Sequence, residues 1–563
     1  MKWLQRKAKV TPKKHDNLID SVAKIRGIDD ISRFLNPTQD ELHSPYLLKN
    51  VEKASERIIQ AIRNNERIVV SYDADADGIT ATTIMLRWLG HYTSNIDYIY
   101  GERNDGHGIT EQLKTNLNEE NNAERLERAR NNIAKVKEAD LLILIDSSSN
   151  DTKVCENIAS VGIDIIILDH HEIERPNPHV LMVNPQQEGC VYPNKSISGA
   201  GVVFKTIQVM EDELGEIDPF YFMDLVAVGM YADVMRVDVL ENRFMIMHGL
   251  RNIKNTGLLR ILKGAKVDLF KIDSSAIGFS IAPLLNGVAR MGSIKLAIDI
   301  LLEDDDNVCK KLRLQMQKLN DKRKELQKQI VENYMKKVDS SQKVLMVFDE
   351  QSSKGFNGIV AQNLSETYKR PVIVGRIHNG TVSGSFRSYN GFKFKSFLQQ
   401  FGDLGFKIEA LGHEGAGGII ISETLLGDLE NYIEANMPSL DEREPTIVYD
   451  LEFDISEIHE HIRDMEQINL IVGNGFPKVI VKVNNITVEE SQCIGKTMET
   501  VKIKTFDNLE LIKFRVNEDY ASELGYFDEI SVVGQLQMNE FYNFGLKQKI
   551  STPQIMIEDY RVE

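Results

Sequence analysis

The sequence predicts an α/β protein with two α/β lobes, joined by a long helix and followed by a C-terminal β-rich module. Short β-branched strands alternate with amphipathic helices from residue 66 to about 240, and again from 342 to about 440. A charged helical pattern separates these regions, and short apolar runs between turns fill the chain after residue 445. At 563 residues the chain is too long for one core, so several domains are expected.

The composition is that of an ordinary globular protein, with 42% hydrophobic and 27% charged residues. We expect no signal peptide, no membrane span and a cytoplasmic location. The four cysteines lack Cys-x-x-Cys spacing, which argues against a zinc ribbon or a disulfide framework. The net charge of −17 disfavours nucleic acid as a partner, but local charge sets the properties of a cleft, so the total does not exclude it.

Residues 1–45 are expected to form a helical lead-in, interrupted at Pro37. The first fourteen residues are basic and include Trp3. This segment suits either a solvated arm or a contact with a phosphate backbone, and the sequence does not decide between them.

The first lobe, residues 46–303, is expected to contain a doubly wound parallel sheet. Its strands are predicted at Ile68–Ser71, Ile96–Tyr100, Leu141–Ile145 and Ile163–Leu168, with helical segments between them. In such sheets the carboxyl ends of the strands lie side by side and form the ligand site.

Aspartates and histidines follow these predicted strands. A single Asp-x-Asp is more often an acidic surface loop, but here acidic groups recur at several strand ends. They are Asp73, Asp75 and Asp77 before a helix expected from Ile79, Asp146 after the third strand, Asp169-His170-His171 after the fourth, and Asp233 after the apolar helix Leu225–Tyr231.

Carboxylates gathered at one sheet edge repel one another and are costly to desolvate unless a divalent cation neutralises them. Asp oxygens with a single imidazole suit Mn²⁺ or Mg²⁺ better than zinc. This many carboxylates favour two ions about 4 Å apart, which activate water and neutralise the oxygens of a phosphoryl group.

The series from Asp73 to Asp233 resembles the DHH phosphoesterase superfamily and, within it, the RecJ single-strand-specific exonucleases. The likeness extends over most of the chain. Further RecJ-like segments are Ser198–Lys205, Asp224–Ala227 with Ala232-Asp233, Glu241-Asn242-Arg243, and Ile281–Asn286 with Arg290.

The resemblance implies a role for each matching residue. Asp73 would be a metal ligand or a carboxylate beside the ligands, and His171 would face the scissile phosphate or its leaving oxygen. Arg103 and Arg290 would hold the nucleic-acid backbone. The implied ligands of Mn²⁺ or Mg²⁺ are Asp75, Asp77, Asp146, His170 and Asp233.

The chain departs from the usual RecJ pattern at three places. Tyr72 and Ala74 replace the Gly and Tyr of Gly-Asp-Tyr-Asp-Ala-Asp-Gly. The usual Gly-Tyr-Gly is Gly106-His107-Gly108, and the usual Asp-Asn-Gly is Asp146-Ser147-Ser148. None of these changes removes an implied ligand, so we expect activity to be retained.

Residues 304–340 predict a long helix with a narrow apolar stripe. A solvated connector between domains is the favoured interpretation. The basic residues Lys318, Lys322 and Arg323 leave open a role in lining a channel for a strand.

Residues 341–440 are expected to form a second α/β lobe, similar to the DHHA1 substrate domain. A strand at Val344–Phe348 is followed by a turn at Gly355–Gly358 and a helix that ends at Tyr368. We expect two phosphate-binding loops, Gly384–Ser388 with Ser385 and Arg387, and Gly412–Gly418 with His413.

Residues 441–563 contain β-rich segments separated by short turns, for which an OB-fold is the leading interpretation. The expected strands are Ile447–Phe453, Lys478–Val483, Thr500–Lys504, Leu511–Val516 and Ile530–Met538. Gly473–Pro477 and Asn539–Tyr542 resemble the OB-like module of RecJ.

The resemblance therefore implies a metal-dependent exonuclease of DNA repair or recombination that degrades single-stranded DNA, with 5′-to-3′ polarity. A single-strand-binding protein or a helicase would be a possible partner. Two alternatives remain open. One is a phosphodiesterase of short oligonucleotides or cyclic dinucleotides, and the other is a catalytically silent DNA-binding replication protein.

Overall fold

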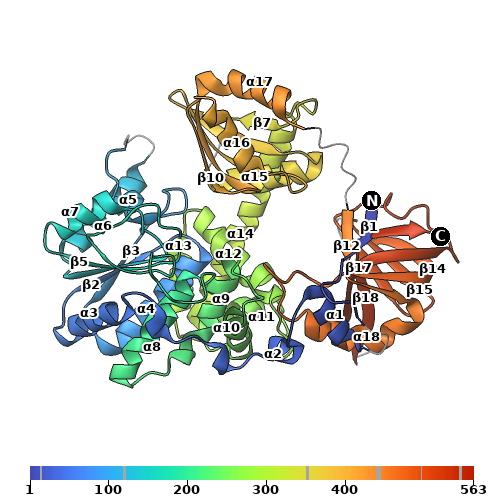
Figure 1. Ribbon diagram of the computed structural model, residues 1–563, viewed down its shortest axis with the longest axis horizontal. Helices are drawn as coiled ribbons and strands as arrows, with labels where there is room; N and C mark the ends of the chain where they lie inside the picture. Colours follow the sequence, from blue (N-terminus) through green and yellow to red (C-terminus); the bar gives the residue numbers. More distant parts are fainter. Residues whose placement is uncertain (13–15, 118–121, 350–353, 439–445, 496–497, 544–547) are drawn as a thin grey trace.

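The computed structural model describes residues 1–12, 16–117, 122–349, 354–438, 446–495, 498–543 and 548–563. Two α/β lobes lie at the two ends of the long helix α14 (Asp306–Met335), and a β-rich module lies beside the first lobe (Figure 1). This arrangement confirms the predicted fold class. In the described part of the chain, no helix combines the length and apolar character needed to cross a bilayer.

The first lobe contains a parallel sheet of five strands among the described residues, in the order β3-β2-β4-β5-β6. The chain reverses direction across the sheet between β2 and β4, which is where ligands bind in doubly wound folds. The three-residue strand β6 was not predicted because it is too short for a pattern. The strands are β2 (Ile68–Tyr72), β3 (Ile96–Tyr100), β4 (Leu141–Ile145), β5 (Asp164–Leu168) and β6 (Leu181–Val183).

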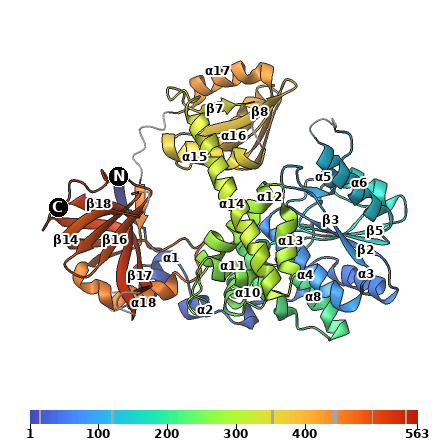
Figure 2. The same cartoon turned by 180° about the vertical axis from the view of Figure 1, so that it is seen from behind.

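Helices cover both faces of this sheet (Figures 1 and 2). A second group of helices packs against α4 and α8. The first group is α3 (Val51–Arg63), α4 (Ala76–Tyr92), α5 (Gly108–Gln112), α6 (Ala123–Lys137), α7 (Thr152–Ala159) and α8 (Gly199–Leu214). The second is η4 (Pro219–Phe222), α9 (Met223–Ala232), α10 (Leu240–Arg251), α11 (Thr256–Gly264), the π-helical turn η5 (Ile277–Ile281), α12 (Ala282–Arg290) and α13 (Ile294–Leu302).

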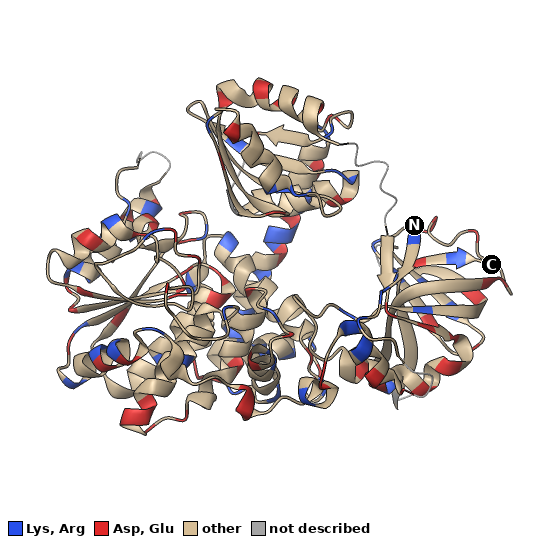
Figure 3. Ribbon diagram, viewed as in Figure 1, with Lys and Arg blue, Asp and Glu red and all other residues tan. Residues whose placement is uncertain are grey.

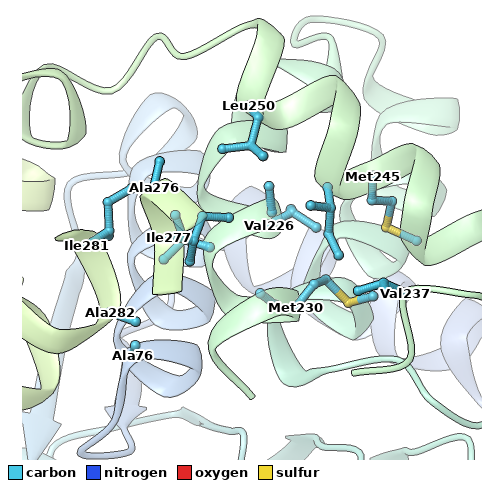
Figure 4. Close-up of a cluster of buried hydrophobic side chains, with 14 of the residues drawn as sticks. Ala76, Val226, Met230, Val237, Met245, Leu250, Ala276, Ile277, Ile281 and Ala282 are labelled. Atoms are coloured by element: carbon cyan, nitrogen blue, oxygen red, sulfur yellow. The ribbon is translucent and has the colours of Figure 1, made fainter. Parts of the chain in front are cut away.

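The first residue of α4, Ala76, is anchored in the core of this lobe. Figure 4 shows it beside Ala282, below the buried side chains that α9, α10 and η5 contribute. The amide of Ala76 also donates a hydrogen bond of 3.0 Å to Oδ1 of Asn286 on α12. Aspartates on both sides of Ala76 are therefore fixed to a close-packed core, whose geometry does not yield easily.

The second lobe follows α14, which runs directly from one lobe into the other (Figure 2). Its sheet has the order β10-β11-β9-β8-β7, and β7 and β8 are the parallel pair among the described strands. Its strands are β7 (Leu345–Phe348), β8 (Val372–His378), β9 (Thr381–Arg387), β10 (Ile408–His413) and β11 (Ala416–Ser422). Its helices are α15 (Lys354–Tyr368), α16 (Phe394–Asp403), η6 (Glu423–Leu425) and α17 (Leu426–Asn436).

Three local expectations for this lobe were wrong. The turn expected at Gly355–Gly358 lies inside α15. The expected loop Gly384–Ser388 is mostly strand β9, and Gly412–Gly418 is the hairpin between β10 and β11. The glycines allow close approach between strands, because a Cβ on Gly384 would lie 2.5 Å from the carbonyl oxygen of Val374.

The β-rich module contains a closed barrel. Strand β14 pairs with both β15 and β17, and β18 joins β16 to β17, so five described strands form a ring, as in an OB-fold. The segment expected as one strand at Ile447–Phe453 is divided between β12 and β13. The elements are β12 (Thr446–Tyr449), β13 (Leu451–Asp454), η7 (Ile455–Glu457), α18 (Ile458–Ile468), β14 (Val481–Ile494), β15 (Thr500–Thr505), β16 (Glu510–Phe514), β17 (Glu529–Asn543) and β18 (Gln548–Val562).

The N-terminal segment joins this module. Strand β1 (Lys2–Gln5) pairs in parallel with β12, and Nε1 of Trp3 donates a 2.8 Å hydrogen bond to Asp559. Arg26 donates to both oxygens of Asp450. The segment is therefore docked rather than a solvated arm. The helices that follow β1 are α1 (Leu18–Arg26), α2 (Ile31–Leu35), η1 (Gln39–Glu41) and η2 (Pro45–Leu47).

Candidate metal centre and phosphate-binding residues

The first three aspartates lie where β2 passes into α4. The helix begins at Ala76, earlier than expected, because Asp75 caps it: Oδ1 of Asp75 accepts hydrogen bonds from the amides of Asp77 and Gly78, each 3.1 Å long. The three carboxylates therefore occupy one tight turn instead of an extended loop.

Asp77 is held by the beginning of α8. Its oxygens accept hydrogen bonds from the hydroxyl of Ser198 and from the amides of Gly199 and Ala200, at 2.9, 2.7 and 3.1 Å. Glycine is required at position 199 because a Cβ there would lie 2.6 Å from Oδ1 of Asp146. The start of α8 thus fits closely between two of the implied ligands.

His170 lies at the centre of the predicted ligands. Its Nε2 atom is 3.2 Å from Oδ1 of Asp146, 3.3 Å from Oδ2 of Asp233 and 3.8 Å from Oδ2 of Asp77. Ligand atoms of Asp73, Asp75 and Asp146 form a neighbouring group in which all atoms lie within 4.8 Å of one another. A third group, made of Asp146, Asp169, His170 and His171, overlaps both. Neighbouring groups of this kind are the arrangement expected for bound divalent cations.

The electrostatics of these residues fit a bound cation. Burial raises the pKa of Asp146 well above its usual range, and the charges of Asp77, Asp75, Asp73 and Asp233 add to the effect. Burial followed by the charges of Asp77 and Asp75 raises the pKa of Asp233 to about 8. A divalent cation relieves this repulsion and provides the positive charge that the buried carboxylates lack.

Two buried atoms face each other without a hydrogen-bond partner among the described residues: Oδ1 of Asp146 and Nε2 of His170. Burial also lowers the pKa of His170, which favours the neutral imidazole that binds metals. These donor atoms fit Mn²⁺ or Mg²⁺, for which carboxylate oxygens are the usual ligands.

His171 is oriented by Asp169, whose role was not assigned from the sequence. Oδ1 of Asp169 accepts a 2.7 Å hydrogen bond from Nδ1 of His171, and Oδ2 accepts one of 2.6 Å from Ser149. Burial lowers the pKa of His171, but the hydrogen bond and charge of Asp169 outweigh it and raise that pKa to about 10. The hydrogen bond to Asp169 therefore fixes the orientation of the ring and favours its cationic form beside the candidate metal centre.

Arginines from both lobes gather at this edge. Nη1 of Arg103 donates a 3.1 Å hydrogen bond to Oδ2 of Asp75. Burial, together with the positive charges of Arg103, Arg323 and Arg387, lowers the pKa of Arg290 to about 10. Three guanidinium groups thus act on a fourth, and such a concentration of positive charge is suited to a polyanion.

Arg323 was assigned mainly to a connector, yet it belongs to this cluster. It lies on α14, where lysines and arginines follow the helix as it leaves the first lobe (Figure 3). Arg323 therefore connects α14 to the candidate site, and sequence periodicity alone did not distinguish it from a solvated residue.

The remaining predicted residues lie on one face of the second sheet. Arg387 on β9 pairs with Ala416 on β11, which pairs with His413 on β10, so these residues form one row across three strands. Ser385 lies two residues before Arg387 and shares its face. His413 is exposed, and it has no hydrogen bond with the described residues that would tie it to the arginine cluster.

Two family models match the chain. The DHH family N-terminal domain matches residues 67–230, which contain most of the metal centre, and the RecJ OB domain matches residues 449–559. These regions correspond to the parallel sheet and to the closed barrel. The barrel assignment made from the sequence is thereby confirmed.

Two known proteins resemble the chain over nearly all of its length. The single-stranded-DNA-specific exonuclease RecJ of Bacillus subtilis strain 168 is 28% identical over 583 residues, covering 100% of this chain and 69% of that protein. A putative SPbeta prophage-derived single-strand DNA-specific exonuclease, YorK, from the same strain is 27% identical and covers 96% of this chain and 95% of its own length.

A solved structure also shares the fold. RecJ from Thermus thermophilus in complex with Mn²⁺ superposes with a TM-score of 0.77 and 21% identity, covering 100% of this chain and 79% of that one. The family models and the relatives agree with the family resemblance seen in the sequence. The chain thus contains a DHH family N-terminal domain and a RecJ OB domain, and it resembles RecJ exonucleases over its whole length.

Proposed function

We infer that this protein is a metal-dependent exonuclease that hydrolyses phosphodiester bonds in single-stranded DNA. The observation that supports this most directly is that the arginine cluster lies next to the candidate metal centre. Arg103 bonds to Asp75 of the metal centre, and Arg290 is close enough to Arg103 and to Arg387 of the second lobe for their charges to act on it. A cation centre beside converging guanidinium groups is what phosphodiester hydrolysis requires.

We propose that the metal ligands are the residues whose ligand atoms lie close to His170 or to Asp146. Two bound ions would supply an activated water and would neutralise the attacking and leaving oxygens. Asp73 completes the second group of carboxylates, and His171, held by Asp169, donates a hydrogen bond or a proton to the phosphate. The proposed ligands are Asp75, Asp77, Asp146, His170 and Asp233.

The arginine cluster is proposed to hold the phosphates next to the scissile bond. Arg103 and Arg290 contribute from the first lobe, Arg323 from α14, and Ser385, Arg387 and His413 from the second lobe. Guanidinium groups bind phosphate oxygens in pairs, which fixes position as well as charge. Arg103 also forms an ion pair with Asp75, which places it next to the proposed ligands.

We further propose that each segment of the chain has its own role. Residues 1–45 are a lead-in, 46–303 are catalytic, 304–340 connect, 341–440 bind the substrate end, and 441–563 hold the strand beyond the site. The closed barrel suits this last role because OB-folds bind single strands. The proposed polarity is 5′-to-3′, with action in DNA repair or recombination alongside a single-strand-binding protein or a helicase. The four free cysteines suit the cytoplasm.

Cleavage assays on three substrates test the proposed activity: a long single strand, a blunt duplex and a dinucleotide, each with Mn²⁺ or with EDTA. We expect Mn²⁺-dependent release of mononucleotides from the long single strand and little release from the duplex. Preferential cleavage of the dinucleotide would support a phosphodiesterase of short substrates. Binding of the long strand without cleavage in Mn²⁺ would support a silent DNA-binding protein. End-labelled strands blocked at one terminus would establish the polarity.

A further inference from the structure

Three carboxylates at the end of β2 are each held by a different set of donors. Asp77 accepts from the start of α8, and Asp75 accepts from its own helix and from Arg103. For the side chain of Asp73, the hydrogen bonds within the described part of the chain come from His107, whose Nδ1 lies 3.0 and 3.2 Å from the two oxygens. Asp73 is 4% exposed, whereas 59% of the His107 side chain is exposed.

The loop that presents His107 is tied to the loop that contains Asp146. Glycines with left-handed backbones flank the histidine, at φ +111° for Gly106 and +79° for Gly108. The amide of Ile109 then donates a 2.9 Å hydrogen bond to the hydroxyl of Ser148. The short segment from His107 to Ile109 is therefore tied, through Ser148, to the loop that carries the proposed ligand Asp146.

Ser148, which accepts this hydrogen bond, has an unusual backbone conformation. Its backbone φ is +74°, a left-handed value that residues with a Cβ seldom adopt. The backbone of Asp146 is also left-handed, with φ of +58°. Nearby, Oγ1 of Thr110 donates a 2.8 Å hydrogen bond to Asp151. Together with a bond from the amide of Thr110 to Asp151, three hydrogen bonds between the loops restrain the segment that carries His107.

We propose that His107 is a positioning residue that holds the Asp73 carboxylate at the metal centre; this inference rests on the proposed function. Nδ1–H of the imidazole donates to Asp73, so the oxygens of Asp73, Asp75 and Asp146 face a common point. His107 itself is absent from every group of possible metal ligands among the described residues, which favours a partner of a ligand over a ligand. Removing such a partner typically lowers metal affinity by roughly 10–100-fold.

The experiment measures Mn²⁺ binding by isothermal titration calorimetry and cleavage of a long single strand, on the full chain. His107→Ala and His107→Phe both remove the donor, and the phenylalanine keeps a ring of similar size. His107→Asn retains an N–H near the position of Nδ1. His91→Ala is the matched control, because His91 is a similarly exposed histidine paired with Glu216 at 3.2 Å.

We expect His107→Ala and His107→Phe to weaken Mn²⁺ binding by about 10-fold or more and to raise the Mn²⁺ concentration for half-maximal cleavage equally. His107→Asn should recover part of the affinity, and saturating Mn²⁺ should restore most of the cleavage rate. His91→Ala should match the wild type in both measurements.

Wild-type Mn²⁺ affinity in a folded His107→Phe protein would overturn the proposal, as would an equal loss in His107→Asn and His107→Ala. If the wild-type chain neither binds Mn²⁺ nor cleaves DNA, the proposed function itself fails. The two failures are therefore distinguishable.

Discussion

Nε2 of His170 lies 3.2 Å from Oδ1 of Asp146, and both atoms are buried without a hydrogen-bond partner among the residues that the structure describes. A buried polar atom without a partner costs about 1–3 kcal/mol, so two of them facing each other require compensation. A cation bound between them would satisfy both atoms and relieve the repulsion among the surrounding carboxylates.

The first prediction concerns His171. His171→Ala should reduce kcat by about 10²–10⁴, the usual contribution of a positioned proton donor. Mn²⁺ affinity and KM should change little, because Asp169 holds the Nδ1 atom of His171 and His171 is not one of the proposed ligands. Steady-state cleavage kinetics and calorimetry separate these quantities. A large loss of Mn²⁺ affinity with unchanged kcat at saturating metal would reassign His171 as a ligand.

The second prediction concerns Arg387. Arg387→Ala should raise KM by about 10–100-fold, which corresponds to the loss of about 1.5–3 kcal/mol from a charged hydrogen bond to phosphate. Mn²⁺ binding should be unaffected because the guanidinium group comes from the second lobe. Arg376→Ala is the control, since Arg376 is an exposed arginine on the adjacent strand β8. If Arg387→Ala had a wild-type KM but no longer bound Mn²⁺, the assignment of Arg387 to phosphate binding would be wrong.

The third prediction concerns the pH dependence of stability. Glu102 is 8% exposed, and burial raises its pKa to about 7, although the amide of Ile294 donates to Oε2 and opposes this shift. A carboxyl whose pKa rises on folding favours the folded state below about pH 4.5, and this contribution is lost as the pH rises through 7.

Glu102→Gln should therefore unfold at a higher temperature than the wild type at pH 8, with a gain of at most about 3 kcal/mol. Near pH 4 the wild type and Glu102→Gln should unfold at similar temperatures. Thermal melts across this range provide the test, with exposed Glu138→Gln as the control. A variant that is less stable than the wild type at pH 8 would show that the carboxylate is needed in its charged form.

The fourth prediction concerns the β-rich module. The five proposed ligands all precede residue 234, so a folded chain ending at residue 440 should still cleave very short oligonucleotides in Mn²⁺. It should lose affinity for long strands, and its binding should depend less steeply on salt. A folded truncation that binds and degrades a long strand like the full chain would contradict the strand-binding role of the barrel.

This truncation also has a structural cost. The buried guanidinium group of Arg243 donates hydrogen bonds to the carbonyl oxygens of Phe34 and Ile471, at 2.6 and 2.9 Å. Removing residue 471 leaves one of these bonds unmade, and β1 loses its partner β12. The truncated chain should therefore melt at a lower temperature, so circular dichroism has to precede any assay.

The convergence of the candidate ligands could be predicted because it follows from strand topology. Parallel strands align their carboxyl ends, so Asp75 after β2, Asp146 after β4 and His170 after β5 had to meet. The exact beginning of α4 could not be predicted, since Asp75 acts as a helix cap as well as a candidate ligand. A sequence pattern does not show both roles of one residue.

The groups that hold the ligands could not be predicted. Ser198 binds Asp77 and His107 binds Asp73 through tertiary contacts between segments that are 121 and 34 residues apart. Arg323 was ambiguous because a charged helix face is the same pattern whether it faces solvent or a substrate. The glycines near residue 384 suggested loops, whereas they permit the close packing of neighbouring strands.

The most direct test of the metal-dependent mechanism is Mn²⁺ titration of Asp146→Asn by calorimetry, with single-strand cleavage measured on the same samples. Asparagine tolerates the left-handed backbone at this position, where φ is +58°, so the fold should be retained. We predict that Mn²⁺ binding is lost, that cleavage falls by at least about 10²–10³-fold, and that the metal-free variant melts above the metal-free wild type because one repelled carboxylate is gone. Wild-type Mn²⁺ binding and wild-type cleavage in Asp146→Asn would contradict the account.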